Sequence, residues 1–487
     1  MQTKMKQKSF LKNKSFFRIA FLTNVFFFSV HFLQYISYVA VVLLILWGIG
    51  LVIRDIAKGT IKKTYFFKFF AIFLSLGVLS HVVNLIADDG EIFPTIVGLV
   101  LLAITAIFMF LFIPNTDTKK GVLGREMFYV TNVYFYSSII INVIGIILLF
   151  VFKTELGERI IIYDNRFVGA YINPNMGAFC CFLGVVSGLL LTNKKFCVNA
   201  GKKVLDKRIC FFGMLINYIC IAISDSKGAL LALTTFVILC SVFSIYKAKT
   251  SPRKRHIISA IVSVVMIFVC LFGVVPCQKL MSSVVNSESA STVVLAQSVN
   301  EQNREQNDGE VTFDHESEKE KNGGGRTTLW KQCFEFFEQK PLLGWGAGNL
   351  LLMGDKTEAN TIDNMKIDLG AKLFEAHNGY LTLLASSGVL GFLTFASFIL
   401  ILLAVILKNT FLKVKHGGIG KTVYATSCVI ALLVYALVEP SLVYYPSLVV
   451  TAFWFFMGLS IKGATENEQL QLTVPTQKAI GHRLYNE

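Results

Sequence analysis

Four side chains in this sequence have the chemistry that phosphate binding and proton transfer require. Three are cations, Arg166, Lys227 and Arg326, and the fourth is the imidazole of His377. An arginine fork binds two phosphate oxygens at once, and a lysine supplies a compact positive charge. Such cations can stabilise the negative charge that develops on a pyrophosphate leaving group. An imidazole with an unperturbed pKa of about 6.5 is suited to take a proton from an attacking hydroxyl.

Each of these residues also has a purely structural interpretation. An arginine near a helix end often reaches lipid headgroups, and a histidine near a helix start can cap the backbone. An asparagine before a proline is a common helix-start signal, and an aspartate two residues from a lysine can simply pair with it. The polar residues that could support a site are Asn173, Asn175, Asp225, Asn378 and Tyr380.

The remaining sequence is typical of a membrane protein. Of the 487 residues, 54% are hydrophobic, 43 are Phe and only 16% are charged. Since about 20 apolar helical residues cross a bilayer, we expect an all-α integral membrane protein with about twelve spanning helices in a single domain, 1–487. The predicted spans are 16–33, 35–53, 65–86, 92–113, 127–152, 171–191, 209–223, 228–246, 256–275, 388–407, 422–438 and 441–461.

The distribution of charge predicts the orientation of these spans. Lys and Arg accumulate on the cytoplasmic side of short connections. Alternate connections, together with both ends of the chain, carry 32 of the 46 basic residues and only 7 of the 31 acids. Both termini, including the tail 462–487, are therefore predicted to be cytoplasmic. The net charge of +15 reflects this orientation and not nucleic-acid binding.

One long connection, 276–387, is predicted to lie outside the membrane as a large extracytoplasmic loop. Its segment 282–325 is rich in Ser, Asn, Gln and Glu, which favours a flexible, solvated chain. From Arg326 onward, apolar residues recur at helical spacing and predict an amphipathic helix that ends at Pro341. A second short helix should begin near Ala376 and lead into the tenth span. The four candidate residues then meet on the outer surface.

Cysteine usage supports neither a disulfide framework nor a metal site. Nine of the ten Cys lie in or near the predicted spans or the cytoplasmic connections, and only Cys333 lies well inside the outer loop. The sequence therefore predicts no metal and no cofactor.

The candidate residues occur in motifs that resemble the O-antigen ligase and polymerase family over roughly 165–405. The first half has Arg166 followed by Asn173-Pro174-Asn175, then Ser226-Lys227-Gly228. The second half has Arg326-Thr-Thr-Leu-Trp, Pro341-Leu-Leu-Gly-Trp-Gly-Ala-Gly-Asn and His377-Asn-Gly-Tyr. The family commonly has an arginine where this chain has Lys227, which keeps the charge but loses the bidentate fork.

The resemblance implies a bacterial integral-membrane glycosyltransferase of the inner or plasma membrane, with its site facing the periplasm or exterior. Such enzymes use undecaprenyl-pyrophosphate-linked glycans as donors, without an essential metal. Arg166 and Arg326, with Lys227 in a weaker role, would contact the donor pyrophosphate. His377 would activate the acceptor hydroxyl for an inverting transfer.

Three functions remain open on the sequence. We expect a polymerase that joins lipid-linked oligosaccharide repeats into O-antigen, capsule or wall polysaccharide. The alternative is a ligase that moves the glycan to a lipid, protein or wall acceptor. A transporter of lipid-linked glycan belongs to another class, and the absence of a clear internal repeat disfavours it. The expected partners are the lipid-linked donor, the glycan acceptor, membrane lipids, and a flippase or chain-length regulator of the same pathway.

Overall fold

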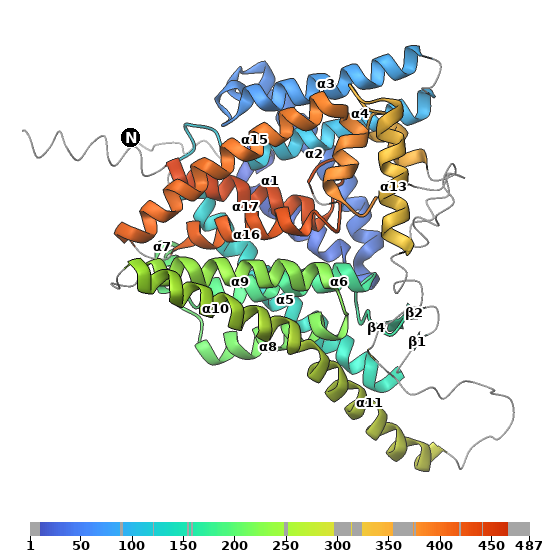
Figure 1. The fold of residues 1–487 in the computed structure, drawn as a ribbon, viewed down its shortest axis with the longest axis vertical. Coiled ribbons are helices and arrows are strands. Elements are labelled where there is room, and N and C mark those ends of the chain that lie inside the picture. Colours follow the sequence, from blue (N-terminus) through green and yellow to red (C-terminus); the bar gives the residue numbers. More distant parts are fainter. Residues whose placement is uncertain are drawn as a thin grey trace, which may run out of the picture.

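Most of the chain folds into helices, as the long apolar runs predict. The computed structural model describes residues 10–87, 91–119, 121–152, 155–156, 159–247, 252–296, 313, 324–353, 374, 376–417, 420–440 and 442–465. In Figure 1 the long helices run side by side, and short strands lie at one end of them.

The first part of the chain forms five helices and two small hairpins. The helices are α1 (Lys14–Phe28), α2 (Gln34–Ala57), α3 (Phe67–Ile86), α4 (Ile92–Ile107), which continues as a π-helical turn (Phe108–Phe112), and α5 (Val122–Phe152). The antiparallel hairpins pair β1 (Glu155–Leu156) with β2 (Arg159–Ile160) and β3 (Ile162–Tyr163) with β4 (Arg166–Phe167). Short 3-10 turns cover Phe10–Lys12, His31–Leu33 and Thr60–Lys63.

The second part contains the remaining helices. They are α6 (Pro174–Leu191), α7 (Lys194–Asn199), α8 (Lys207–Ile223), α9 (Lys227–Lys247), α10 (Pro252–Phe272), α11 (Val274–Ala296), α13 (Gly324–Gln339), α14 (Ala347–Leu351), α15 (Gly379–Gly417), α16 (Lys421–Tyr435) and α17 (Leu448–Thr465).

Eight helices of the described residues are long and apolar enough to cross a membrane. They are α2 with its preceding turn, α3, α4 with its π-helical turn, α5, α6, α9, α15 and α17. This finding agrees with an all-α integral membrane protein. Shorter helices occupy three other predicted spans, namely α1, α8 and α16. The count of twelve spans stays a prediction.

The break between the first two helices positions the loop that carries Arg166. The predicted spans 16–33 and 35–53 require a turn between them, and α1 ends at Phe28 before α2 begins at Gln34. In this turn the backbone N–H of His31 donates to the carbonyl of Ala170 over 3.1 Å. The backbone N–H of Ile172 donates to the carbonyl of Ser29 over 3.0 Å. The end of α1 is therefore fastened to the segment between β4 and α6.

The core is built around α6 and α17, in which most side chains are buried. Small residues let the neighbouring helices approach α6 closely. A Cβ atom added at Gly184 would lie 2.4 Å from the Ser138 Oγ of α5 and 2.6 Å from the Asn217 Oδ1 of α8. Such small-residue contacts are the usual way in which membrane helices pack, because lipid removes the hydrophobic drive for association.

The predicted outer loop, 276–387, agrees with the structure in some segments and differs from it in others. A helix, α13, lies where the amphipathic helix from Arg326 is predicted, and the predicted short helix before the tenth span corresponds to the first part of α15, which is broken at Gly388 with φ 61°. The sequence did not predict that α11 stays helical to Ala296, because its Ser- and Asn-rich sequence has no apolar periodicity. The rest of the predicted flexible segment, 297–325, lies largely outside the described residues.

The two ends of the bundle are different in character. In Figure 1, α13 and the strands lie at one end of the long helices, and α7 lies at the other. The first end carries the candidate residues, and the second carries a basic pocket lined by residues of α1 and α2.

Candidate functional site

Arg166 is held by a tight hairpin at the end of the bundle. Tyr163 pairs with Arg166 across β3 and β4, and the two turn residues, Asp164 and Asn165, have φ of 50° and 55°. Asn and Asp tolerate this left-handed conformation better than most residues, which explains their presence here. The neighbouring Phe167 is buried and anchors the hairpin. The hairpin backbone thus fixes the position from which the Arg166 side chain extends.

The guanidinium of Arg166 connects two segments that are far apart in the sequence. Its Nε donates to the backbone carbonyl of Ser224 over 2.9 Å, and its Nη2 donates to Oδ1 of Asn175 over 2.6 Å. The first contact reaches the turn between α8 and α9, and the second reaches the first turn of α6. Arg166 therefore lies where these three segments converge.

The two asparagines that flank Pro174 have different roles. Asn173 is the N-cap of α6, because its Oδ1 accepts from the backbone N–H of Met176 over 2.8 Å. Pro174 follows at the first helical position, where the missing N–H has no cost. Its role as the helix cap therefore accounts for Asn173 without a role in substrate binding. Asn175 instead reaches out of the helix: besides Arg166 it accepts from the Ser226 hydroxyl over 3.1 Å.

The turn between α8 and α9 presents Lys227 at the start of a helix. Asp225 has a φ of 44°, which turns the chain sharply, and Ser226 is buried against Asn175. Lys227 begins α9 and is exposed. Lys227 directly follows the Ser224–Ser226 turn, which Arg166 contacts at the Ser224 carbonyl. Close packing below it depends on Gly228, since an added Cβ would lie 3.0 Å from the Tyr435 ring.

The segment with His377 is fastened to the end of α16. Asn378 Oδ1 accepts from the backbone N–H groups of Tyr380 and Leu381 over 3.0 and 3.1 Å, so Asn378 caps the start of α15. The Tyr380 hydroxyl donates to the carbonyl of Leu433 over 2.8 Å, and the Gly379 N–H donates to that of Ala436 over 2.7 Å.

These contacts leave His377 in a left-handed conformation, with φ of 45°. A residue without glycine's freedom adopts this conformation only when its surroundings impose it. Its partly exposed side chain is thereby presented at the helix start.

Glu439 joins the histidine to the arginine. Its Oε2 lies 3.6 Å from Nδ1 of His377, within ion-pair distance for a protonated imidazole. Its Oε1 accepts from Nδ2 of Asn175 over 3.2 Å. A continuous polar chain thus runs from Arg166 through Asn175 and Glu439 to His377. The Glu439 side chain is only 16% exposed, which strengthens its interaction with neighbouring charges.

The sequence analysis did not single out Glu439. It lies between the predicted spans 422–438 and 441–461, where the only signal is an acid followed by Pro440. The charge alternation places that connection on the same side as His377, so a search of every outer connection for titratable residues would have found it.

Arg326 lies near the start of α13 and completes the group of cations. The hydroxyl of Tyr435, at the end of α16, interacts electrostatically with Glu439, Arg326 and Arg166. The apolar face of α13 packs on the bundle, because Leu329 and Cys333 are buried in one cluster with Trp345, Leu350, Met353, Phe374, Ala376 and Ala385.

The glycine-rich segment after α13 docks onto α3 and α4. Ser80 and Asn84 of α3 donate to the carbonyl of Gly344 over 3.0 and 3.1 Å. The Lys340 ammonium donates to Asn84 Oδ1 over 2.7 Å. A Cβ at Gly348 would lie 1.9 Å from the Pro94 carbonyl oxygen, so only glycine fits. This docking fixes the end of α13 relative to the bundle.

Comparison with known families agrees with the sequence motifs. Residues 212–396 match the family model described as O-antigen ligase. This part of the chain belongs to the O-antigen ligase family. The predicted family is therefore confirmed. No curated protein matches the chain.

The O-antigen ligase match includes Lys227, Arg326 and His377 and stops before α16. Arg166, Asn175 and Glu439 lie outside it, and the structure brings them to the matched residues. The match implies a multi-pass membrane protein whose substrates are lipid-linked glycans.

Proposed function

We propose that this protein is a metal-independent inverting glycosyltransferase that takes a glycan from undecaprenyl pyrophosphate and joins it to a hydroxyl of another lipid-linked oligosaccharide. Repetition of this step makes a polysaccharide, so the protein is a polymerase. The observation that carries the proposal is the polar chain Arg166–Asn175–Glu439–His377, in which one cation and an imidazole–carboxylate pair share one site.

The acceptor hydroxyl attacks the anomeric carbon of the donor sugar. The bond between that carbon and the pyrophosphate oxygen breaks, and the electron pair leaves with undecaprenyl pyrophosphate. Because the hydroxyl attacks from the face opposite the leaving group, the configuration is inverted. The hydroxyl proton passes to His377. The Glu439 carboxylate, 3.6 Å from Nδ1, stabilises the imidazolium that forms.

The cations bind and stabilise the leaving group. Arg166 and Arg326 contact the pyrophosphate oxygens, and Lys227 adds positive charge at the start of α9, whose helix dipole also favours an anion. Negative charge builds on the pyrophosphate as the bond breaks, so these contacts are stronger in the transition state than in the ground state. Asn175 orients the Arg166 fork.

A ligase that transfers the finished glycan to a different acceptor is the second candidate. The description of the matching family as O-antigen ligase favours it. Donor handling by the cations and proton removal by His377 would be the same in both reactions. The two functions differ only in the acceptor.

The polymerase is distinguished from the ligase by deletion of the gene in the organism that encodes it, followed by analysis of its glycans. The expected result is loss of long chains with accumulation of single lipid-linked repeats. Accumulation of long chains still on the lipid carrier would contradict polymerisation and assign the ligase reaction. Repeats retained on the cytoplasmic leaflet would instead indicate transport.

A further inference from the structure

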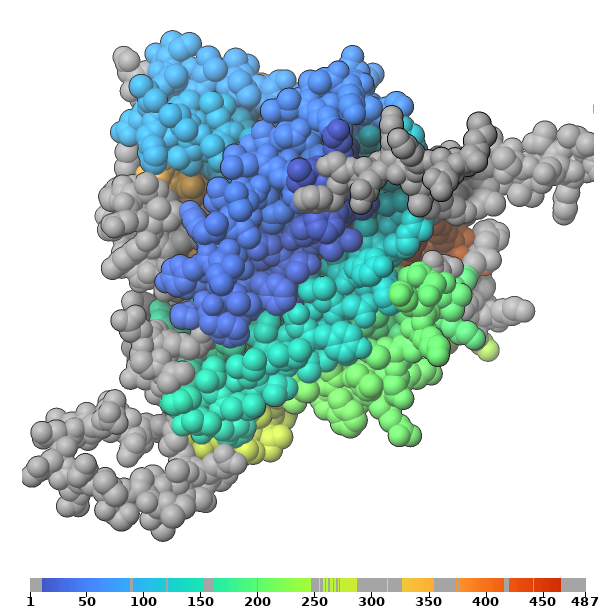
Figure 2. Space-filling view, turned by 180° about the vertical axis from the view of Figure 1, so that it is seen from behind, coloured from blue at the N-terminus to red at the C-terminus, as the bar shows by residue number. Residues whose placement is uncertain are grey.

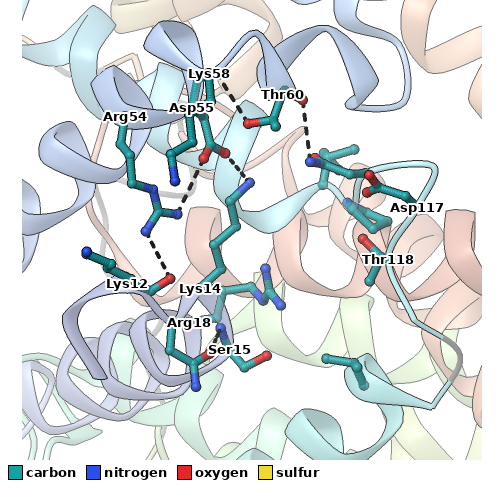
Figure 3. A pocket seen from close by; sticks show the side chains of 15 residues that line it. Lys12, Lys14, Ser15, Arg18, Arg54, Asp55, Lys58, Thr60, Asp117 and Thr118 are labelled. Atoms are coloured by element: carbon teal, nitrogen blue, oxygen red, sulfur yellow. Dashed lines mark hydrogen bonds and ion pairs between the residues drawn. The ribbon is translucent and has the colours of Figure 1, made fainter. Parts of the chain in front are cut away.

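A pocket of about 540 Å³ lies at the end of the bundle opposite the proposed active site. Its fifteen lining residues come from the turn before α1, the start of α1, the end of α2, the connections after α2 and before α5, and the first residue of α5. Figure 3 shows the charged side chains of this lining. Helix α1 begins in this pocket, and its far end is bonded to the loop that follows Arg166. A helix of 15 residues spans about 22 Å, so the two sites are separate.

Two charged residues of the pocket are already neutralised by neighbours outside the lining. Arg18 forms two hydrogen bonds with the buried Glu126, from Nε over 2.7 Å and from Nη2 over 2.6 Å. Asp117 pairs with Lys63 over 2.9 Å. Neither residue therefore determines the charge that a ligand would meet.

The other charged residues of the lining leave an excess of positive charge. They are four cations, Lys12, Lys14, Arg54 and Lys58, and one carboxylate, that of Asp55. Lys14 and Arg54 both reach this carboxylate, as Figure 3 shows. One negative charge cannot neutralise four positive charges in a partly enclosed space, so the pocket attracts an anion.

Two further observations point to a ligand with hydrogen-bond acceptors. Within the described part of the chain, Arg54 Nε is buried and has no hydrogen-bond partner, although Nη1 donates to the Lys12 carbonyl over 3.0 Å. Burial lowers the pKa of Lys14, opposed by its contact with Asp55. An anion would accept a hydrogen bond from Arg54 Nε and stabilise the charged form of Lys14. The N-terminus of α1 adds its dipole.

The surroundings of the pocket indicate where the anion comes from. Exposed apolar side chains flank the pocket residues: Leu11 lies in the turn before α1, Phe16 lies in α1, and Ile53 and Ile56 lie in α2. Trp47 packs on Phe16, with ring centroids 5.9 Å apart. Apolar residues beside Trp and a cluster of cations are typical of the membrane interface. Figure 2 shows this N-terminal part of the chain, in dark blue, at the molecular surface.

We propose that this pocket binds the phosphate group of an anionic membrane lipid, such as phosphatidylglycerol, which enters from the side of the exposed apolar residues. The cations hold the phosphate, and the acyl chains lie along α1 and α2. The bound lipid bridges α1, α2 and the connection before α5, and so stabilises this end of the bundle. Inorganic phosphate offers the same phosphate oxygens without acyl chains. Competition between inorganic phosphate and the lipid therefore distinguishes the two sources of the anion.

The test is a titration of the purified full-length chain in neutral detergent, followed by native mass spectrometry. Short-chain phosphatidylglycerol, short-chain phosphatidylcholine and inorganic phosphate are the three probes. Phosphatidylglycerol should bind at least about fivefold more tightly than phosphatidylcholine, since each basic residue near an anionic surface contributes about 1 kcal/mol. Inorganic phosphate should not displace it at equal concentration.

Variants connect this binding to the pocket. Lys58→Gln, at an exposed position, and Arg54→Gln should each weaken phosphatidylglycerol binding about fivefold. Lys207→Gln, an exposed cation at the start of α8, is the matched control and should bind like the unmodified chain. Equal binding of the two lipids, or unchanged binding in Lys58→Gln, would overturn the proposal. Displacement by inorganic phosphate would reject the lipid as the source of the anion.

Discussion

Nδ1 of His377 lies 3.6 Å from Oε2 of Glu439, although the two residues belong to segments on either side of two long helices. The pair exists because the His377 segment is fastened to the end of α16 by the Gly379 N–H and the Tyr380 hydroxyl. A carboxylate at this distance stabilises the protonated form of an imidazole. Under the proposed function, Nε2 of His377 is then the atom that takes the proton.

The first prediction concerns Glu439. Replacing Glu439 by Gln keeps the shape of the side chain but removes the charge that stabilises the imidazolium. We expect kcat for glycan transfer to fall by roughly a hundredfold, with little change in KM for the donor, because Glu439 does not contact the pyrophosphate. The measurement is a steady-state assay with purified lipid-linked donor.

The matched control is Glu335→Gln, which removes an exposed carboxylate from α13 that pairs weakly with Lys331 over 3.8 Å. Its kcat should be that of the unmodified chain. If Glu439→Gln also retained full kcat, the imidazole–carboxylate pair would have no catalytic role.

The second prediction concerns the fork of Arg166. In Arg166→Lys the charge is kept, but a lysine cannot donate to both the Ser224 carbonyl and the Asn175 side chain with the same geometry. We expect KM for the donor to rise about tenfold, as loss of one charge-assisted hydrogen bond predicts.

Asn175→Ala should show part of the same effect, because it leaves the fork in place without its support. Arg208→Lys, an exposed arginine of α8, serves as the control and should leave KM unchanged. A donor KM that stays the same in Arg166→Lys would mean that charge alone suffices at this position.

The four principal candidates could be found from the sequence because only 14 of the 46 basic residues lie outside the predicted cytoplasmic segments. Arg166, Lys227, Arg326 and His377 all lie outside the long apolar runs, and the charge alternation gives them one side of the membrane. The order of their motifs along the chain indicated the O-antigen ligase and polymerase family.

Glu439 could not be found in this way. Its contacts with Asn175 and His377 depend on how α6, α15 and α16 pack, which no local pattern records. The helical part of α11 beyond Ser282 was also missed, because its polar sequence has no apolar periodicity. Apolar stretches predicted most helices well, since their length and hydropathy are local properties.

The third prediction tests the docking of the glycine-rich segment. Gly348→Ala places a Cβ 1.9 Å from the Pro94 carbonyl oxygen, so α14 must move away from α4. We expect a stability loss of about 1–3 kcal/mol, measured as a lower Tm in detergent, because overpacking typically has this cost. Gly50→Ala is the control, since an added Cβ there has nothing within 4 Å. A Tm for Gly348→Ala equal to that of Gly50→Ala would contradict the described packing.

The fourth prediction uses Cys333 to test the burial of the inner face of α13. Burial raises the pKa of the Cys333 thiol to about 12. At pH 8 the reactive thiolate is then about one part in 10⁴, so alkylation by iodoacetamide should be very slow and should rise with pH up to that value. Gln339→Cys, at an exposed position of the same helix, should react at the rate of an ordinary thiol. Rapid alkylation of Cys333 at pH 8 would show that α13 does not stay packed on the bundle.

The most direct test of the central claim is the rate at which proteoliposomes of the purified chain release undecaprenyl pyrophosphate from a lipid-linked oligosaccharide, compared between the unmodified chain and His377→Ala. The proposed mechanism predicts a fall of about 10² to 10⁴ in this rate, because His377 is the general base, with donor binding retained by Arg166 and Arg326. A His377→Ala variant that releases undecaprenyl pyrophosphate at the unmodified rate would contradict the account.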